Sequence, residues 1–388
     1  MSYMAEYIDM QMNHGEMEIK LTELIKEYCD KTKKQLIIYS VNFQQMNNLP
    51  IELNMDDFYT IRDLLRNDNS KSLSFYIETP GGSGEVAEEI ATFLRKNYNY
   101  VDFLVAGECK SAGTILTMCG DEICLNETGS LGPIDAQIKI GRHFGSAHDY
   151  MKWVEDKMDE ADEKGSLNNF DALMVAQISP DELIGVENNL EYGKELVRDF
   201  LKKYKFKNWE IKETSGIEVT DEIREERANE IADKLANHSL WKSHGRSLKI
   251  DTLTEDIKLK IKNINEDEKI SEIIERIHVL LRLIFSSGHS YKIIATKDTK
   301  LVKTAVEVQM PVSSQPSMNI NISCNQCGSD FPLYVNFSRD SRIDKELQEQ
   351  GRLPFPKNSK IICECGEKLD LSEVRKQIEI DFGKFIYD

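Results

Sequence analysis

Strand-like and helix-like segments alternate along the first third of the chain, and this alternation limits the folds that it can adopt. Apolar runs rich in β-branched and aromatic residues lie at residues 35–43, 72–80, 101–108 and 121–126. Helical patterns lie at residues 17–34, 55–67, 84–98 and 111–118. Strands that alternate with helices predict an α/β fold with a parallel sheet and right-handed crossovers.

After about residue 146 the sequence becomes mainly helical, and it changes character again near its end. The later helical patterns lie at residues 147–165, 190–204, 221–238 and 267–285. In VQMPVSSQPSMN, by contrast, Pro, Ser, Gln and Asn cluster without any period. We therefore expect a first domain over residues 1–303, a linker over 304–318 and a separate module over 319–388.

Charge and hydropathy argue against two classes of partner for the main domain. The net charge of -18 disfavours a nucleic-acid partner, because duplex binding depends on Lys and Arg that neutralise phosphates. No apolar run approaches the roughly 20 residues of a membrane helix. The first residues, MSYMAEYIDMQMNHGEMEIK, also lack the basic and apolar regions of a secretory signal. We expect a soluble cytoplasmic protein without a membrane partner.

Two glycine-bearing segments directly follow predicted strands, where open α/β sheets place their ligand sites. The first, ETPGGSG, contains Gly81 and Gly82, whose backbone can approach a ligand closely and point N–H groups at an oxygen. The second, GECKSAGT, places Ser111 at the start of a helix. Taken singly, the two glycines are more often a plain turn and the serine is more often a helix N-cap. Together they predict a nucleophile beside an oxyanion hole.

The same two segments resemble a known peptidase group. ETPGGSGEVAEEI and KSAGTILTMCGDEICLNETGSLGPIDAQ are similar to Clp-type proteases, and above all to the serine dehydrogenase proteinase family, a relative of signal peptide peptidase A and the Clp proteolytic subunit. The resemblance spans residues 21–302. It implies a Clp/crotonase-like spiral of repeated ββα units with a helical C-terminal extension.

The resemblance also implies an activity and residues that carry it. It implies a serine endopeptidase that assembles with copies of itself, acts on a protein or peptide substrate and needs no organic cofactor. Ser111 matches the nucleophile of the family. Gly81, Gly82 and Ala112 match the residues of the oxyanion hole.

The general base departs from the Clp pattern. Clp-type triads carry a histidine after the nucleophile's strand, but GSLGPIDAQ contains none. In the signal peptide peptidase branch a lysine of a later helix acts instead, and Lys152 resembles it; this role requires burial that lowers the lysine pKa. We predict a Ser–Lys dyad with Lys152. His244, in a Trp-x-x-His loop, is the rival base, predicted to orient substrate, while Asp135 and Gln137 are predicted to support the site by hydrogen bonds.

Four cysteines of the C-terminal module form two pairs. Cys324 and Cys327 stand in a Cys-x-x-Cys-Gly motif, and Cys363 and Cys365 in a Cys-x-Cys-Gly motif. Two such knuckles can supply the four thiolates of a tetrahedral zinc site, with glycine in each tight turn. Disulfides or two unrelated pairs are the alternatives. We predict a β-rich, zinc-ribbon-like module with a structural Zn²⁺, which could recruit a partner.

Two other functions are compatible with these motifs. The chain could be a catalytically silent scaffold that uses the Clp-like fold for assembly and the zinc module for recruitment. It could also be a crotonase-type acyl-CoA enzyme, which builds an oxyanion hole on the same fold but needs no serine at the helix start.

Overall fold

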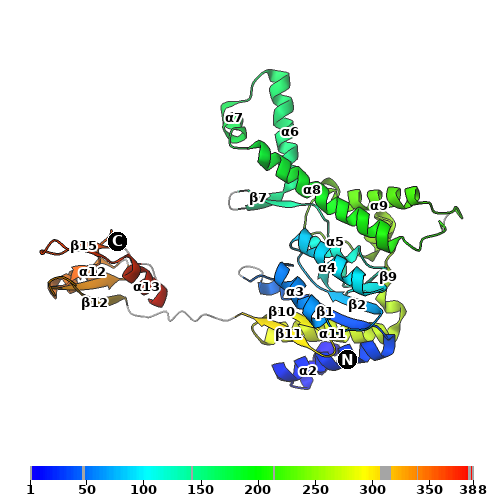
Figure 1. Cartoon of the computed structure of the whole chain (residues 1–388), viewed down its shortest axis with the longest axis horizontal. Coiled ribbons are helices and arrows are strands. Elements are labelled where there is room, and N and C mark those ends of the chain that lie inside the picture. Colours follow the sequence, from blue (N-terminus) through cyan, green and yellow to red (C-terminus); the bar gives the residue numbers. More distant parts are fainter. Residues whose placement is uncertain are drawn as a thin grey trace. The chain divides into compact units, whose positions relative to one another are not determined.

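The chain forms two compact units, Met1–Ala305 and Val306–Asp388. The computed structural model describes residues 2–45, 49–140, 143–212, 215–305, 316–338, 340–382 and 386 (Figure 1). Most of the predicted linker, at residues 306–315, lies outside the described residues.

A seven-stranded sheet lies at the centre of the first unit, in the order β11-β10-β1-β2-β3-β5-β9. Its strands are β1 (Gln35–Val41), β2 (Ser72–Ile77), β3 (Tyr100–Val105), β5 (Glu122–Leu125), β9 (Lys262–Asn263), β10 (Ser290–Ala295) and β11 (Lys300–Thr304). The predicted parallel arrangement is confirmed for β1, β2, β3 and β5, which β9 extends. The sequence did not predict the antiparallel hairpin β10–β11 at one edge, where a tight turn between Thr296 and Thr299 reverses the chain.

Helices cover both faces of this sheet, because successive side chains of a strand point to opposite faces. Ile37 and Tyr39 of β1 face one core, while Leu36 and Ile38 face the other. The first core receives α3 (Met55–Leu64), α4 (Gly84–Asn97) and α5 (Ala112–Thr117). The second core receives α1 (Tyr3–Asp9), α2 (His14–Thr32) and α11 (Glu268–Ser287). The two cores make the sheet a rigid platform for whatever its strand ends carry.

Short strands form a second layer beyond the carboxyl ends of the main strands. β4 (Glu108–Cys109) pairs in parallel with β6 (Ser130–Leu131), and Thr79 forms a bridge to Cys109. After β2 and again after β3, the chain thus makes a short strand-like step and then enters a helix, α4 or α5. This repetition is the ββα unit of the predicted Clp-like fold.

The helical extension of the first unit begins after a hairpin of β7 (Gln137–Ile140) and β8 (His143–Ser146). It comprises α6 (Ala147–Lys164), α7 (Asn169–Val175), α8 (Pro180–Phe200), a π-helix (Leu201–Lys205), α9 (Asp221–Ala236) and α10 (His238–Trp241). In Figure 1, α6 and α7 project away from the sheet. Sequence patterning missed α7 and placed the start of α8 too late, although Ser179 caps that helix and Pro180 opens it.

Short helical turns complete the first unit: 3₁₀ turns at Phe43–Gln45 and Ile264–Glu266, and a π-helix at Thr252–Asp256. No helix among the described residues is both long and apolar enough to span a membrane.

The second unit is small, combines short strands with two helices and has a core of its own. Its strands are β12 (Ser317–Ser323), β13 (Asp330–Asn336), β14 (Leu353–Pro354), β15 (Lys360–Ile362) and β16 (Lys368–Asp370), and its helices are α12 (Ser341–Glu349) and α13 (Ser372–Phe382). Leu333, Val335, Phe337 and Phe355 are among its buried residues. The strand content agrees with the predicted β-rich module.

Candidate active site

Backbone hydrogen bonds bring the two glycine-bearing segments side by side. The Thr79 amide donates to the Glu108 carbonyl at 2.9 Å, and the Lys110 amide donates to the Thr79 carbonyl at 2.9 Å. This parallel pairing follows that of β2 and β3 beyond the main sheet, with the register shifted by two residues between the Tyr76–Leu104 pair and the Thr79–Cys109 bridge. As a result, a Cβ added to Gly81 would lie only 2.7 Å from the Ser111 Cβ.

Ser111 has a backbone conformation that L-residues rarely adopt. Its φ of 49° and ψ of -119° lie outside the favoured regions, and its side chain makes no capping hydrogen bond to α5. Such strain costs on the order of 1–3 kcal/mol and is concentrated at functional sites. The N-cap interpretation of this serine is therefore not supported, because the hydroxyl does not contact the helix amides.

The glycine turn offers backbone donors next to this hydroxyl. Gly81 and Gly82 have φ values of 113° and 141°, which glycine alone adopts without strain. The Gly81 amide donates to Thr79 Oγ1 at 3.2 Å. Within the described parts of the chain, the amides of Gly82 and Ala112 donate to no protein acceptor. Two free donors near a strained serine can stabilise a developing oxyanion.

A buried carboxylate, that of Asp135, joins two histidines. The Asp135 side chain is fully buried; its Oδ1 accepts from His244 Nδ1 at 2.9 Å and its Oδ2 from His238 Nδ1 at 2.7 Å. Burial alone would raise the pKa of Asp135, but the hydrogen bonds and charges of the two histidines bring it below its ordinary value. Each histidine thus keeps Nε2 free of this carboxylate.

Lys110 links the segment that carries Ser111 to the loop that carries His244. Its buried Nζ contacts Ser247 Oγ at 2.8 Å, Ser130 Oγ at 3.1 Å and the Arg246 carbonyl at 3.4 Å. Burial lowers the pKa of Lys110 below its ordinary value. Sequence reasoning missed Lys110 and also His238. The sequence offered only their positions as signals: Lys110 is next to Ser111, and His238 is six residues before His244.

The predicted base Lys152 and the predicted supporting residue Gln137 lie away from these contacts. Lys152 is exposed on α6, which projects from the sheet in Figure 1, so it lacks the burial that a neutral lysine base requires. Gln137 is exposed in β7, and its side chain makes no hydrogen bond to the described residues. Ser111 Oγ likewise makes no hydrogen bond within the part of the chain described. Catalytic hydrogen bonds are often long before substrate binds.

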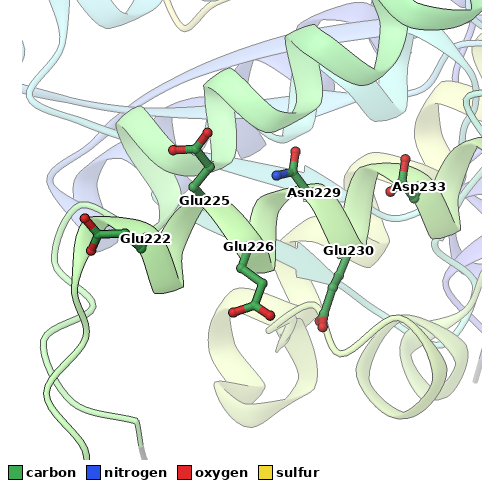
Figure 2. A pocket seen from close by; sticks show the side chains of 6 residues that line it. All are labelled: Glu222, Glu225, Glu226, Asn229, Glu230 and Asp233. Atoms are coloured by element: carbon green, nitrogen blue, oxygen red, sulfur yellow. The ribbon is translucent and has the colours of Figure 1, made fainter.

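A groove of about 440 Å³ lies apart from these residues, along α9 (Figure 2). Its lining is mainly acidic and consists of Glu222, Glu225, Glu226, Asn229, Glu230 and Asp233. It contains no serine, cysteine or histidine. Helix α9 contributes to the candidate site only near its end, where the Leu235 carbonyl accepts from the Ile134 amide at 3.0 Å.

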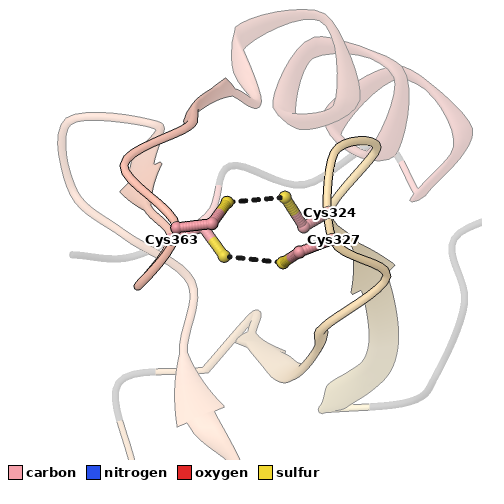
Figure 3. A group of neighbouring side chains, drawn as sticks. Cys324, Cys327 and Cys363 are labelled. Atoms are coloured by element: carbon pink, nitrogen blue, oxygen red, sulfur yellow. Dashed lines mark hydrogen bonds between the residues drawn. The ribbon is translucent and has the colours of Figure 1, made fainter.

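The four predicted metal ligands come together in the second unit (Figure 3). The sulfur atoms of Cys324, Cys327, Cys363 and Cys365 all lie within 4.8 Å of one another. Across the two knuckles, Cys324 Sγ lies 3.7 Å from Cys365 Sγ, and Cys327 Sγ lies 3.4 Å from Cys363 Sγ. A tetrahedral zinc ion with Zn–S bonds of about 2.3 Å separates its sulfur ligands by roughly 3.8 Å. The cluster therefore fits such an ion.

Comparison with protein families identifies the group to which this geometry corresponds. A family model described as "ClpP-like SDH-type serine proteinase" matches residues 8–217, which include both glycine-bearing segments and Asp135. The chain belongs to this family. Membership supports a serine peptidase and the Clp-like fold seen in the first unit. His238 and His244 lie beyond the matched residues.

Individual relatives add little about function. Two uncharacterized proteins of Methanocaldococcus jannaschii are similar: MJ0137, at 26% identity over 206 residues (50% of this chain and 68% of that protein), and MJ1495, at 24% over 203 residues (52% and 56%). The alignment thus spans little more than half of MJ1495.

Two solved structures of the 1510-N membrane-bound stomatin-specific protease also match, both with a TM-score of 0.32. A serine-to-alanine mutant is 11% identical and covers 58% of this chain and 79% of its own. A lysine-to-alanine mutant with a substrate peptide is 14% identical and covers 64% and 79%. At this TM-score, the superposition supports no statement about individual residues of this chain.

The contact between Gly81 and Ser111 leads to a first prediction. Gly81→Ala would place a methyl group 2.7 Å from the Ser111 Cβ at a φ of 113°, and should lower casein cleavage by about a hundredfold or more, because the nucleophile must shift. Gly185→Ala in α8, where no atom lies within 4 Å, is the matched control and should cleave at the wild-type rate. Cleavage by Gly81→Ala at the wild-type rate would contradict the juxtaposition.

Proposed function

We propose that the chain is a serine endopeptidase in which Ser111 attacks the peptide carbonyl carbon. The observation that carries the proposal is the strained, uncapped Ser111 packed against Gly81, in a member of a serine proteinase family. The carbonyl oxygen becomes negative as the Ser111 Oγ–carbon bond forms. The amides of Gly82 and Ala112 are the donors available to it, with Gly81 shaping the turn.

His244 is the proposed base. Its Nδ1–H donates to the Asp135 carboxylate, which fixes the tautomer in which Nε2 accepts a proton. In this mechanism Nε2 takes the proton of Ser111 Oγ and later gives it to the leaving amine, and water then hydrolyses the acyl-enzyme by the same steps. The ionised Asp135 stabilises the imidazolium that forms in each half-reaction.

Three contacts support a place for His244 near the nucleophile. The Leu131 and Leu248 backbones exchange hydrogen bonds of 3.1 and 2.9 Å, so the histidine loop runs beside the segment that leads to Asp135. Lys110 also binds the Arg246 carbonyl and Ser247 Oγ of that loop. An exposed Lys152 on α6 has no comparable support, and it stays the alternative base.

Substitutions distinguish the two candidate bases, His244 and Lys152. Ser111→Ala should abolish casein cleavage, and His244→Ala should lower turnover by about a hundredfold to ten-thousandfold, because a general base contributes that much. Lys152→Ala and the exposed-histidine control His289→Ala should stay near the wild-type rate. Turnover is measured on purified, folded protein.

Two results would overturn parts of this assignment. If Lys152→Ala is inactive and His244→Ala is active, the Ser–Lys dyad replaces the histidine mechanism. If Ser111→Ala cleaves as fast as the wild type, the peptidase proposal fails, and the result favours the catalytically silent scaffold.

We propose that the cysteine cluster of the second unit binds one structural Zn²⁺. The four convergent thiols and the turns at Gly328 and Gly366, with φ values of 77° and 90°, support this site. The ion would hold the two knuckles together in a unit whose own core is small. Recruitment of a partner by this unit stays a prediction of the sequence.

Metal analysis tests the zinc site. Wild-type protein purified without chelator should contain about one zinc per chain, and the Cys324→Ser/Cys327→Ser variant should contain none, because two of four ligands are lost. Cys29→Ser, which changes a buried thiol of the first unit, should keep its zinc. Wild-type protein without zinc in elemental analysis would rule the site out.

We also propose a homo-oligomer, and a cytoplasmic location stays a prediction. Large apolar side chains on the projecting helices support assembly, since Phe170 is 71% exposed, Leu173 68% and Met158 62%. Light scattering should therefore give a mass of several chains. Phe170→Asp should shift this mass toward a single chain, and a wild-type monomer at micromolar concentration would refute assembly.

A further inference from the structure

A fully buried ion pair lies next to residues 52–54, the segment that pairs with the glycine turn. Lys292 Nζ of β10 lies 2.6 Å from Asp57 Oδ2 of α3, and neither side chain is exposed to solvent. Tyr39 Oη donates to the same oxygen at 2.9 Å, and Lys303 Nζ lies 3.2 Å from Asp57 Oδ1. Apolar residues of similar volume often stabilise a core as well as such a pair does. Stability alone therefore gives no reason for these charges.

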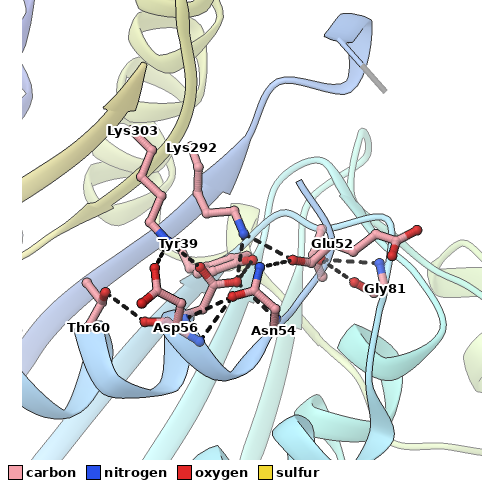
Figure 4. Close-up of polar contacts among 10 residues, drawn as sticks. Tyr39, Glu52, Asn54, Asp56, Thr60, Gly81, Lys292 and Lys303 are labelled. Atoms are coloured by element: carbon pink, nitrogen blue, oxygen red, sulfur yellow. Dashed lines mark hydrogen bonds and ion pairs between the residues drawn. The ribbon is translucent and has the colours of Figure 1, made fainter. Parts of the chain in front are cut away.

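The pair holds one short segment of backbone from both sides (Figure 4). Lys292 Nζ donates to the Glu52 carbonyl at 3.0 Å, and Asp57 Oδ2 accepts from the Asn54 amide at 3.1 Å. The two peptide groups that flank Leu53 are thus tied to opposite charges of one buried pair. Hydrogen bonds to charged groups are about twice as strong as neutral ones, so Leu53 has little freedom to move.

Leu53 in turn pairs with the glycine turn. Its amide donates to the Gly81 carbonyl at 2.7 Å, and its carbonyl accepts from the Ser83 amide at 3.1 Å. A Cβ at Gly82 would lie 2.4 Å from the Leu53 carbonyl oxygen, so the two backbones are in direct contact. The position of the Gly82 amide, a proposed oxyanion donor, therefore depends on where Leu53 is held.

We infer that Asp57 and Lys292 are positioning residues that hold the oxyanion-hole turn through Leu53. The inference rests on the proposed peptidase function. Neither side chain touches the reacting atoms; both act through the backbone of residues 52–54 on Gly81 and Gly82. Loss of the pair should therefore weaken stabilisation of the transition state more than binding of substrate.

A second ion pair, buried only on its carboxylate side, provides a control. Lys34, next to β1, forms an ion pair with Asp102 of β3, whose side chain is 4% exposed. Lys34 and Asp102 lie near the amino ends of β1 and β3. Gly81 and Ser111 follow the carboxyl ends of β2 and β3, which are at the opposite edge of the sheet. Lys34→Met thus removes an ion pair from the same sheet without touching the turn.

Steady-state kinetics of the full chain on a casein-derived peptide give the first test. Lys292→Met should lower kcat by about tenfold to a hundredfold with KM within about twofold, because a displaced oxyanion donor costs that much. Lys34→Met should keep both constants near the wild-type values. Equal losses of kcat in the two variants, or an unchanged kcat in folded Lys292→Met, would overturn the inference.

Amide hydrogen exchange gives a second test that does not depend on activity. In Lys292→Met the amides of Leu53 and Ser83 should exchange about tenfold faster than in the wild type, and in Lys34→Met they should not. Unchanged exchange at these amides would refute positioning, even if the peptidase proposal held. If these amides exchange faster in Lys292→Met but the Ser111→Ala variant still cleaves casein, the positioning role stands and the peptidase proposal fails.

A neutral double variant covers the case in which Lys292→Met does not fold. Asp57→Asn/Lys292→Met leaves no unpaired buried charge, so it should fold, yet it still lacks the bond from Lys292 Nζ to the Glu52 carbonyl. It should show the same loss of kcat and the same faster exchange. Wild-type values of both would overturn the inference.

Discussion

The candidate site depends on the backbone pairing between Thr79 and residues 108–110. This pairing extends two neighbouring parallel strands beyond the sheet, so that the glycine turn and the start of α5 meet at one edge. The approach leaves no room for a side chain at Gly81 beside Ser111. The strain at Ser111 persists because α5 follows directly, with the Ile115 amide bonded to the Ser111 carbonyl at 3.1 Å. Both the proposed nucleophile and its oxyanion donors are consequences of this one contact.

Sequence reasoning could predict this edge of the sheet because its signals are local. Gly81 and Gly82 follow a recognisable strand, and Ser111 precedes a recognisable helix. The rule that parallel strands end at one edge then brings them together without knowledge of the tertiary structure. The four cysteines were predictable for a similar reason, since their short spacings already define two knuckles. Their convergence within 4.8 Å agrees with that prediction.

The contact of His244, the proposed base, with Asp135 could not be predicted in this way, because it is built from distant parts of the chain. His244 and Asp135 are 109 positions apart, and their contact requires the loop after α10 to return beside β6. Lys152 has apolar neighbours in sequence, Met151 and Trp153, which suggested burial. On the projecting helix α6, however, Lys152 faces solvent. The same limit applies to the pair of Asp57 and Lys292, which joins residues far apart in the chain.

Covalent labelling tests whether Ser111 is an activated nucleophile. The full chain is treated with a fluorophosphonate, digested, and analysed by mass spectrometry for the modified residue. We predict a single adduct on Ser111, which forms much more slowly in the Asp135→Asn variant, because the proposed base His244 loses its ionised partner there. No adduct on folded wild-type protein, or an adduct on a different serine, would contradict it.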